Sequence, residues 1–103
     1  MVHVLDKLTV AEFAGQVGRT FRATPENAPA IDLVLVEARD LSLKTKAPGK
    51  GRAPFSLVFV APKGPVLAQR IYPLENETLG RLEIFLVPIG ADSDGVKYEA
   101  IFN

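Results

Sequence analysis

Cysteine is absent from this 103-residue chain, and histidine occurs only once. Without cysteine the chain forms no disulfide, offers no thiolate nucleophile and lacks the usual ligand of structural zinc sites. The single histidine, His3, lies near a chain end, where the packing that holds a catalytic base is commonly missing. We therefore predict no catalytic residue, no metal ligand and no cofactor, and we expect a protein that is not an enzyme.

An excess of one charge and a long apolar run are also missing. Twelve basic residues balance twelve acidic ones, so no overall field attracts nucleic acid or an anionic membrane. The longest nearly apolar segments, 55–62 and 84–89, are far shorter than the ~20 residues of a membrane helix. The opening segment lacks the basic head and apolar run of a secretory signal. We expect a cytoplasmic protein, with later assembly into an extracellular or phage-like particle left open.

The composition, 48% hydrophobic and 23% charged, is that of a single globular domain spanning 1–103. One short helix is predicted at its start. Thr9 and Glu12 have the spacing of a capping box, Leu8 and Phe13 that of a hydrophobic staple, and Gly18 is a natural stop. The residues predicted to share the apolar face of this helix are Val10, Phe13, Ala14 and Val17.

The rest of the chain reads as strands separated by turns. Segments rich in valine, leucine and phenylalanine alternate with breaks containing glycine and proline, and no second helix is indicated. This pattern predicts an α+β, mostly β domain, in which the helix packs on about six antiparallel strands that form a small barrel or sandwich. The predicted strands are 20–23, 31–41, 55–61, 67–74, 80–89 and 96–102.

Some of these strands have two apolar faces. Leu33 and Leu35 alternate with Val34 and Val36, although a helix of about eight residues covers only about two strands. Scattered surface valines are ordinary, but a surplus of this size also fits a subunit interface, with self-association or a protein partner. The candidate interface residues are Val34, Val36, Val58, Val60, Phe85 and Val87.

The segment 42–54 is the clearest loop, basic and free of acidic residues. It could contact an anion or an acidic partner, although a solvated loop is the default. No aromatic residues are interleaved, so it offers no stacking platform and we predict no nucleic-acid binding. Its basic residues are Lys44, Lys46, Lys50 and Arg52.

A ligand pocket inside a closed barrel is the alternative function. Its polar lining would be sought first at Arg70, Tyr72 and Tyr98. An enzyme using carboxylates alone is a weaker alternative, because Glu75 and Glu77 lie in a stretch marked as a connection.

The stretch 92–95, Asp-Ser-Asp-Gly, invites a calcium interpretation. Counted from Asp92, however, the twelfth position is Asn103, which offers no bidentate carboxylate. Asp94-Gly95 between two apolar runs is instead a strong hairpin signal.

Motifs along most of the chain resemble one family. The stretches PFSLVFVAP (54–62), LAQRIYPLENETLGRLEIFLVPIG (67–90) and YEAIFN (98–103), with LTVAEFAGQVGRTF near the start, are similar to small bacterial proteins known as a domain of unknown function. Where relatives often have His-Pro before Leu-Gly, this chain has Asn76-Glu77, so no role of that histidine carries over.

The resemblance implies no activity, but it does imply an association. Members of the family are often encoded beside proteins similar to phage tail-collar or tail-fibre subunits. Together with the surplus apolar faces, this predicts a non-enzymatic interaction or structural accessory module, with a collar-like protein or a second copy as partner.

Overall fold

The computed structural model describes residues 8–26, 28–41, 54–62 and 66–102, and they fold into six strands and one short helix. The predicted fold class, an α+β domain that is mostly β, is confirmed. The elements are α1 (Val10–Ala14), β1 (Thr20–Ala23), β2 (Ile31–Asp40), β3 (Phe55–Ala61), β4 (Arg70–Asn76), β5 (Gly80–Asp92) and β6 (Gly95–Phe102).

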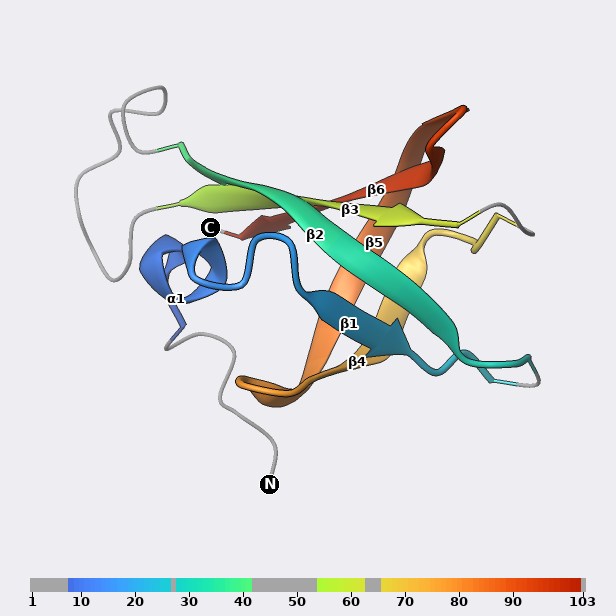
Figure 1. Ribbon diagram of the computed structural model, residues 1–103, viewed down its shortest axis with the longest axis horizontal. Helices are drawn as coiled ribbons and strands as arrows, with labels where there is room; N and C mark the ends of the chain where they lie inside the picture. Colours follow the sequence, from blue (N-terminus) through green and yellow to red (C-terminus); the bar gives the residue numbers. More distant parts are fainter. Residues whose placement is uncertain (1–7, 27, 42–53, 63–65, 103) are drawn as a thin grey trace.

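All strand pairs are antiparallel, and the sheet closes on itself in the order β1-β2-β3-β6-β5-β4 (Figure 1). Of the two predicted architectures this is the barrel. Closure depends on β1 and β4, whose register holds only two pairs, Arg22 with Glu75 and Ala23 with Leu74. By contrast, β3 and β6 are paired over seven residues, and β4 and β5 over another seven. The β1–β4 seam is therefore the thinnest join of the closed sheet.

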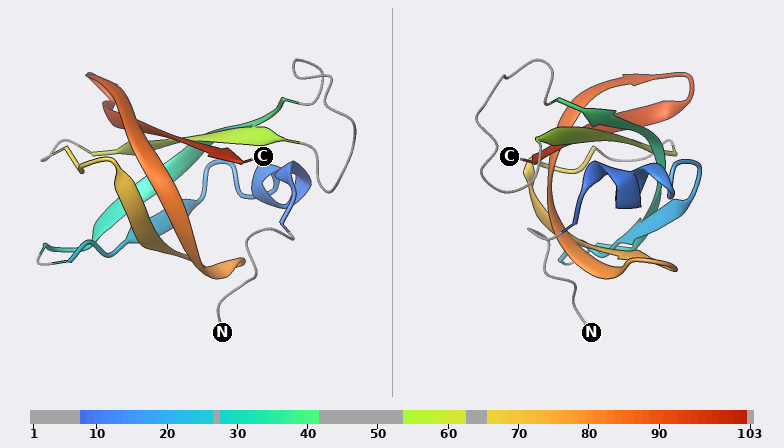
Figure 2. Two further views of the ribbon diagram at one scale, coloured as in Figure 1. Left: turned by 180° about the vertical axis from the view of Figure 1, so that it is seen from behind. Right: turned by 90° about the vertical axis from the view of Figure 1, so that its left-hand side faces the viewer.

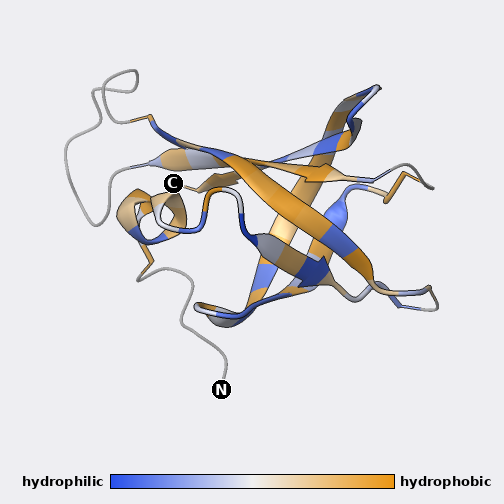
Figure 3. Ribbon diagram, viewed as in Figure 1, coloured by the Kyte–Doolittle hydropathy of each residue, from blue (hydrophilic) through white to orange (hydrophobic). Residues whose placement is uncertain are grey.

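The core lies inside the closed sheet. Alternate residues of each strand point inward, and Figure 3 shows β2 largely hydrophobic along its middle. Burial of these side chains provides the main stabilisation of the fold. The largest fully buried side chains are Tyr98, Phe13, Phe21, Phe55, Phe59, Leu33, Leu35, Leu57, Leu74, Leu82, Ile84 and Leu86.

Helix α1 lies across one end of the closed sheet (Figure 2, right). Its Phe13 is fully buried, with ring centroids 5.6 Å from Phe55 and 5.8 Å from Phe102. The backbone N–H of Thr9 donates to the Glu12 carboxylate at 3.1 Å, which is the glutamate half of the predicted capping box. The helix thus closes this end with an aromatic plug.

The predicted apolar face of α1 is partly wrong. The helix ends at Ala14, before the predicted stop at Gly18, and Val17 is 46% exposed. Gly18 has a φ of +89° and its N–H donates to the carbonyl of Leu35, so the chain has already turned toward β2 by this point. One turn of helix is enough to place Phe13 in the core, and Val17, which follows the helix, is exposed.

Two strand boundaries differ from the prediction by three residues, and the other differences are of one or two residues. The strand expected at 67–74 begins only at Arg70, and the strand expected at 80–89 continues to Asp92. In the first case Leu67 is buried without belonging to a strand, because its N–H donates to the hydroxyl of Tyr98 at 2.8 Å. The hydroxyl of Tyr98 thus accepts the hydrogen bond that a carbonyl of a neighbouring strand would accept if Leu67 were part of the sheet.

Candidate interaction surfaces

The outer face of β2 and β3 carries four valines. Val34 and Val60 are direct cross-strand partners, and Val58 lies opposite Glu37. Alternation already places Val36 on the same outer face as Val34. The register then shifts between Leu35 and Glu37, so β2 has one extra residue there and Glu37, not Val36, stands opposite Val58 as part of a β-bulge. Val34 and Val36 are 37% and 45% exposed. The exposed valines of β2 therefore follow from alternation, and the bulge places the charged Glu37 beside them on the outer face.

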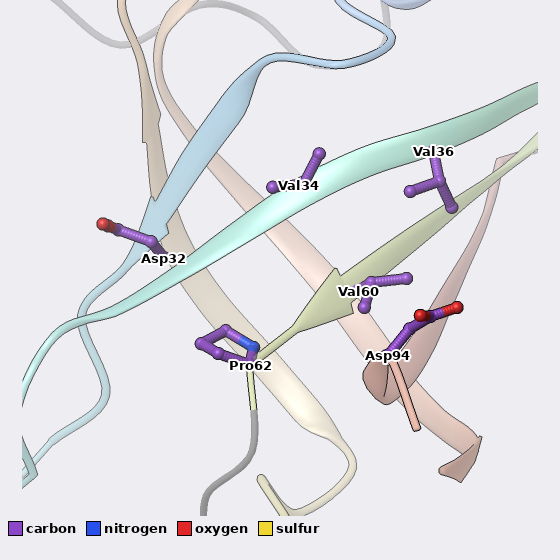
Figure 4. A pocket seen from close by; sticks show the side chains of 6 residues that line it. All are labelled: Asp32, Val34, Val36, Val60, Pro62 and Asp94. Carbon is purple, nitrogen blue, oxygen red and sulfur yellow. The ribbon is translucent and has the colours of Figure 1, made fainter. Parts of the chain in front are cut away.

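Three of these valines, Val34, Val36 and Val60, line a shallow groove of about 460 Å³, which we call the valine groove (Figure 4). Its floor is apolar and its ends carry two carboxylates. One of these, Asp32, is ion-paired with Arg22 at 3.1 Å; the other, Asp94, comes from the β5–β6 turn. The lining residues are Asp32, Val34, Val36, Val60, Pro62 and Asp94.

The structure separates the other two candidate interface residues from this groove. Val58 of β3 is the register partner of Glu99 on β6, and Glu99 is in turn the register partner of Val87 on β5. A charged residue on β6 thus stands between them. Phe85 lies farther along β5, where it is 47% exposed and pairs with Ile71 of β4. The six predicted residues therefore belong to two surfaces.

The predicted ligand contacts do not line an interior pocket together. Both tyrosines are buried, and both hydroxyls bind the backbone that leads into β4: Leu67 N–H donates to Tyr98, and Tyr72 donates to the Ala68 carbonyl at 2.6 Å. Burial raises the pKa of Tyr72, an effect that Arg70 partly opposes. The tyrosines act as clamps on this connection, and Arg70 is exposed outside the core.

Arg70 and Tyr72 instead contribute to a second groove of about 560 Å³, which we call the β4 groove. It lies over the outer side of β4, between side chains of β5 and the segment that follows β1. Sequence reasoning missed most of it, because its parts come from three separated stretches. The lining residues are Thr24, Pro25, Glu26, Arg70, Ile71, Tyr72, Pro73, Arg81 and Glu83.

The Asp-Ser-Asp-Gly stretch is the predicted hairpin turn. Strand β5 ends at Asp92 and β6 begins at Gly95, which has a φ of +134°. The Asp92 carboxylate accepts a hydrogen bond from Asp94 N–H at 2.8 Å and pairs with Lys97 at 2.8 Å. The hydrogen bond from Lys97 is the main reason that the pKa of Asp92 is lowered, and it raises the pKa of Lys97 in turn.

Other predictions concern residues that the structure does not describe. Lys44, Lys46, Lys50 and Arg52 of the basic loop lie outside the described residues, as does His3. Among residues 8–26, 28–41, 54–62 and 66–102, no cluster of three or more histidine, cysteine, aspartate or glutamate side chains is placed to hold a metal ion. No helix within those ranges is long and apolar enough to cross a membrane.

Fold and surfaces together define a small, closed antiparallel β domain, plugged at one end by a short helix and carrying two grooves on its outer side. The family model described as "Domain of unknown function (DUF6916)" matches residues 8–102, and the chain belongs to this family. The predicted resemblance to a family of unknown function is thereby confirmed. Searches of curated proteins and of solved structures found no match.

Proposed function

We propose that the protein is a non-enzymatic interaction module that binds a protein partner through the valine groove. The observation that carries this proposal is the exposure of Val34 and Val36 beside Val60, in a domain whose core is already filled by other side chains. These valines are not needed to complete the interior. Their contribution to folding is small, so their apolar character points to a surface that becomes buried elsewhere.

The make-up of the groove supports a protein partner. An apolar centre with charge at its margins is the usual arrangement of a protein interface, whose core is depleted of charged residues. Here the valines and Pro62 form the centre, and Asp32 and Asp94 form the margin. Exposed apolar side chains on neighbouring strands also present a broad surface, which suits another folded domain.

Two partners are consistent with this proposal. One is a second copy of the chain, which would make a homo-oligomer. The other is a protein resembling a phage tail collar or fibre, which the sequence resemblance suggests and which would make this protein an accessory of such an assembly. In both cases the valine groove is the contact surface, so one substitution tests both.

The test compares Val36→Lys with Val17→Lys. The two valines are almost equally exposed, at 45% and 46%, but only Val36 lies in the valine groove. Both variants should fold with stability within about 0.5 kcal/mol of the wild type, as exposed positions usually allow. Light scattering during size-exclusion chromatography measures self-association, and co-expression with the product of the adjacent gene or with a collar-like protein measures partner binding.

The expected result is that Val36→Lys loses the oligomer or the complex, whereas Val17→Lys keeps it. The proposal fails if the wild type is monomeric at high concentration and also captures no collar-like protein. It fails equally if both lysine variants bind as the wild type does, because the contact would then lie on another surface.

A further inference from the structure

Strand β4 has an unpaired stretch of edge within the otherwise closed sheet. On the β5 side its register runs through all seven residues, from Asn76 to Arg70 opposite Leu86. On the β1 side the register ends at Ala23 with Leu74, and the last contact is the Thr24 N–H donating to the Pro73 carbonyl at 3.1 Å. Beyond Pro73, the residues 70–72 have a strand on one side only.

The sequence explains why β1 stops there. Pro25 follows Thr24, and proline brings no N–H to continue a ladder and fixes its own φ. Strand β1 consequently has four residues against seven in β4. The chain then continues through Pro25 and Glu26, and both line the β4 groove beside the outer side of β4.

The backbone groups at this edge can be assigned from the register. In an antiparallel strand the N–H and C=O of one residue point to the same side, and the side alternates along the strand. Because the Pro73 carbonyl points toward β1, the N–H and C=O of Ile71 point the same way. Within the described residues no strand stands opposite them. Ile71 therefore offers one donor and one acceptor at the edge, and its side chain is 60% exposed.

Two guanidinium groups stand over the same groove. Arg70 begins β4 and Arg81 lies on β5, and no ion pair in the described parts of the chain involves either. Glu26 and Glu83 also line the groove, so its formal charge is balanced and a polyanion such as nucleic acid would meet two carboxylates. A ligand carrying one carboxylate could instead pair with an arginine and leave the glutamates in water.

We propose that the β4 groove binds an extended peptide segment, which adds to the edge at Ile71 as a strand antiparallel to β4 and places a carboxylate at Arg70. The orientation follows from continuity with β1. A strand that takes over the direction of β1 passes Ile71 and reaches Arg70 with its C-terminal end. Main-chain hydrogen bonds provide affinity in this mode, and side-chain pockets select the sequence. This surface is separate from the valine groove.

The carboxylate has two sources, an acidic side chain or the C-terminus of the peptide. The probe is therefore a displayed library of random peptides of roughly eight residues, in one arm with a free C-terminus and in the other with both ends fused. Binders selected on the wild type are measured against Ile71→Pro and Arg70→Glu. The matched controls are Ile71→Val, which keeps the N–H, and Arg19→Glu, which changes an exposed arginine outside the β4 groove.

Ile71→Pro removes the edge donor without touching the β4–β5 ladder, because the N–H of Ile71 points away from β5. We expect it to melt close to the wild type and to bind the selected peptides about tenfold more weakly. Arg70→Glu should weaken binding by about tenfold to a hundredfold. Both controls should bind as the wild type does. Enrichment only in the free-terminus arm identifies a C-terminal carboxylate, and enrichment in both arms identifies a side chain.

The proposal is overturned if no binder exceeds the Ile71→Pro background, if the binders lack a carboxylate, or if they tolerate both Ile71→Pro and Arg70→Glu. Should Ile71→Pro fail to fold, the binding of the selected peptides to Arg70→Glu decides. Amide hydrogen exchange gives an independent reading, since a slowly exchanging Ile71 N–H in the free protein would show that the edge is already paired. Binders that need Val36 and not Ile71 belong to the valine groove, so the two proposals fail separately.

Discussion

The β2–β3 side of the closed sheet and the β1–β4 side are built very differently. On the first side the two strands pair over six register positions, and the bulge between Leu35 and Glu37 gives β2 one more outward residue. On the second side two register pairs carry the closure, assisted by the side chain of Asn76. The comparison teaches that the β2–β3 side, whose backbone groups are paired, presents side chains on its outer face for contacts. The β1–β4 side instead leaves the N–H and C=O of Ile71 without a partner strand.

The largest effect is expected from the interior of the well-paired side. Phe59 of β3 is fully buried, and its ring meets that of Phe21 edge to face at 5.3 Å. Phe59→Ala should lower the free energy of unfolding by about 3–5 kcal/mol, through lost burial and the cavity left behind. Chemical denaturation measures this loss. Val58→Ala, the outward neighbour on the same strand, is the control and should cost less than about 1 kcal/mol. Equal losses would show that the two faces of β3 do not differ as described.

A smaller loss of stability, located at the β1–β4 seam, is expected when Asn76 is replaced. The buried Asn76 amide donates to the Thr20 carbonyl at 3.2 Å, and its oxygen accepts from the N–H groups of Thr78 and Leu79 at 2.9 and 2.7 Å. Asn76→Ala removes all three hydrogen bonds and should cost about 2–4 kcal/mol, because buried backbone groups lose their partners. Hydrogen exchange should accelerate more at the Thr24 amide than in β3.

The control for the seam is Thr78→Ala, whose side chain is exposed and whose backbone N–H is retained. It should leave exchange at Thr24 unchanged. If Asn76→Ala accelerated exchange equally in β1–β4 and in β2–β3, the β1–β4 seam would not be a separate weak point. The described difference between the two sides would then be wrong.

Local sequence signals predicted the strands far better than they predicted the surfaces. The segment 55–61 could be recognised as a strand because its bulky residues fit a sheet on both faces, and its observed bounds agree with the prediction. Alternation predicted the valines of the valine groove, but neither groove as a whole could be predicted, since each also depends on pairing between distant segments. Asp94 reaches the valine groove from the β5–β6 turn, and β1 ends early beside the β4 groove. Register is a non-local property, and neither a hydrophobic pattern nor a turn signal determines it fully.

The smallest expected effect sharpens the comparison at the turn beside the valine groove. Asp92 and Lys97 form an exposed ion pair across the hairpin, and this pair lowers the pKa of Asp92 below its ordinary value of 3.8. A group whose pKa is lowered by folding stabilises the native state above its ordinary pKa, and the contribution is lost as the pH falls through the lowered value.

Asp92→Asn keeps the acceptor for Asp94 N–H but removes the charge. It should lower the melting temperature slightly at about pH 7 and less at about pH 2, because Asp92 of the wild type takes up a proton as the pH falls through its lowered pKa. Glu83→Gln, an exposed carboxylate with no ion pair among the described residues, is the control. If Asp92→Asn were equally destabilising at both pH values, its effect would come from the shape of the turn and not from its charge.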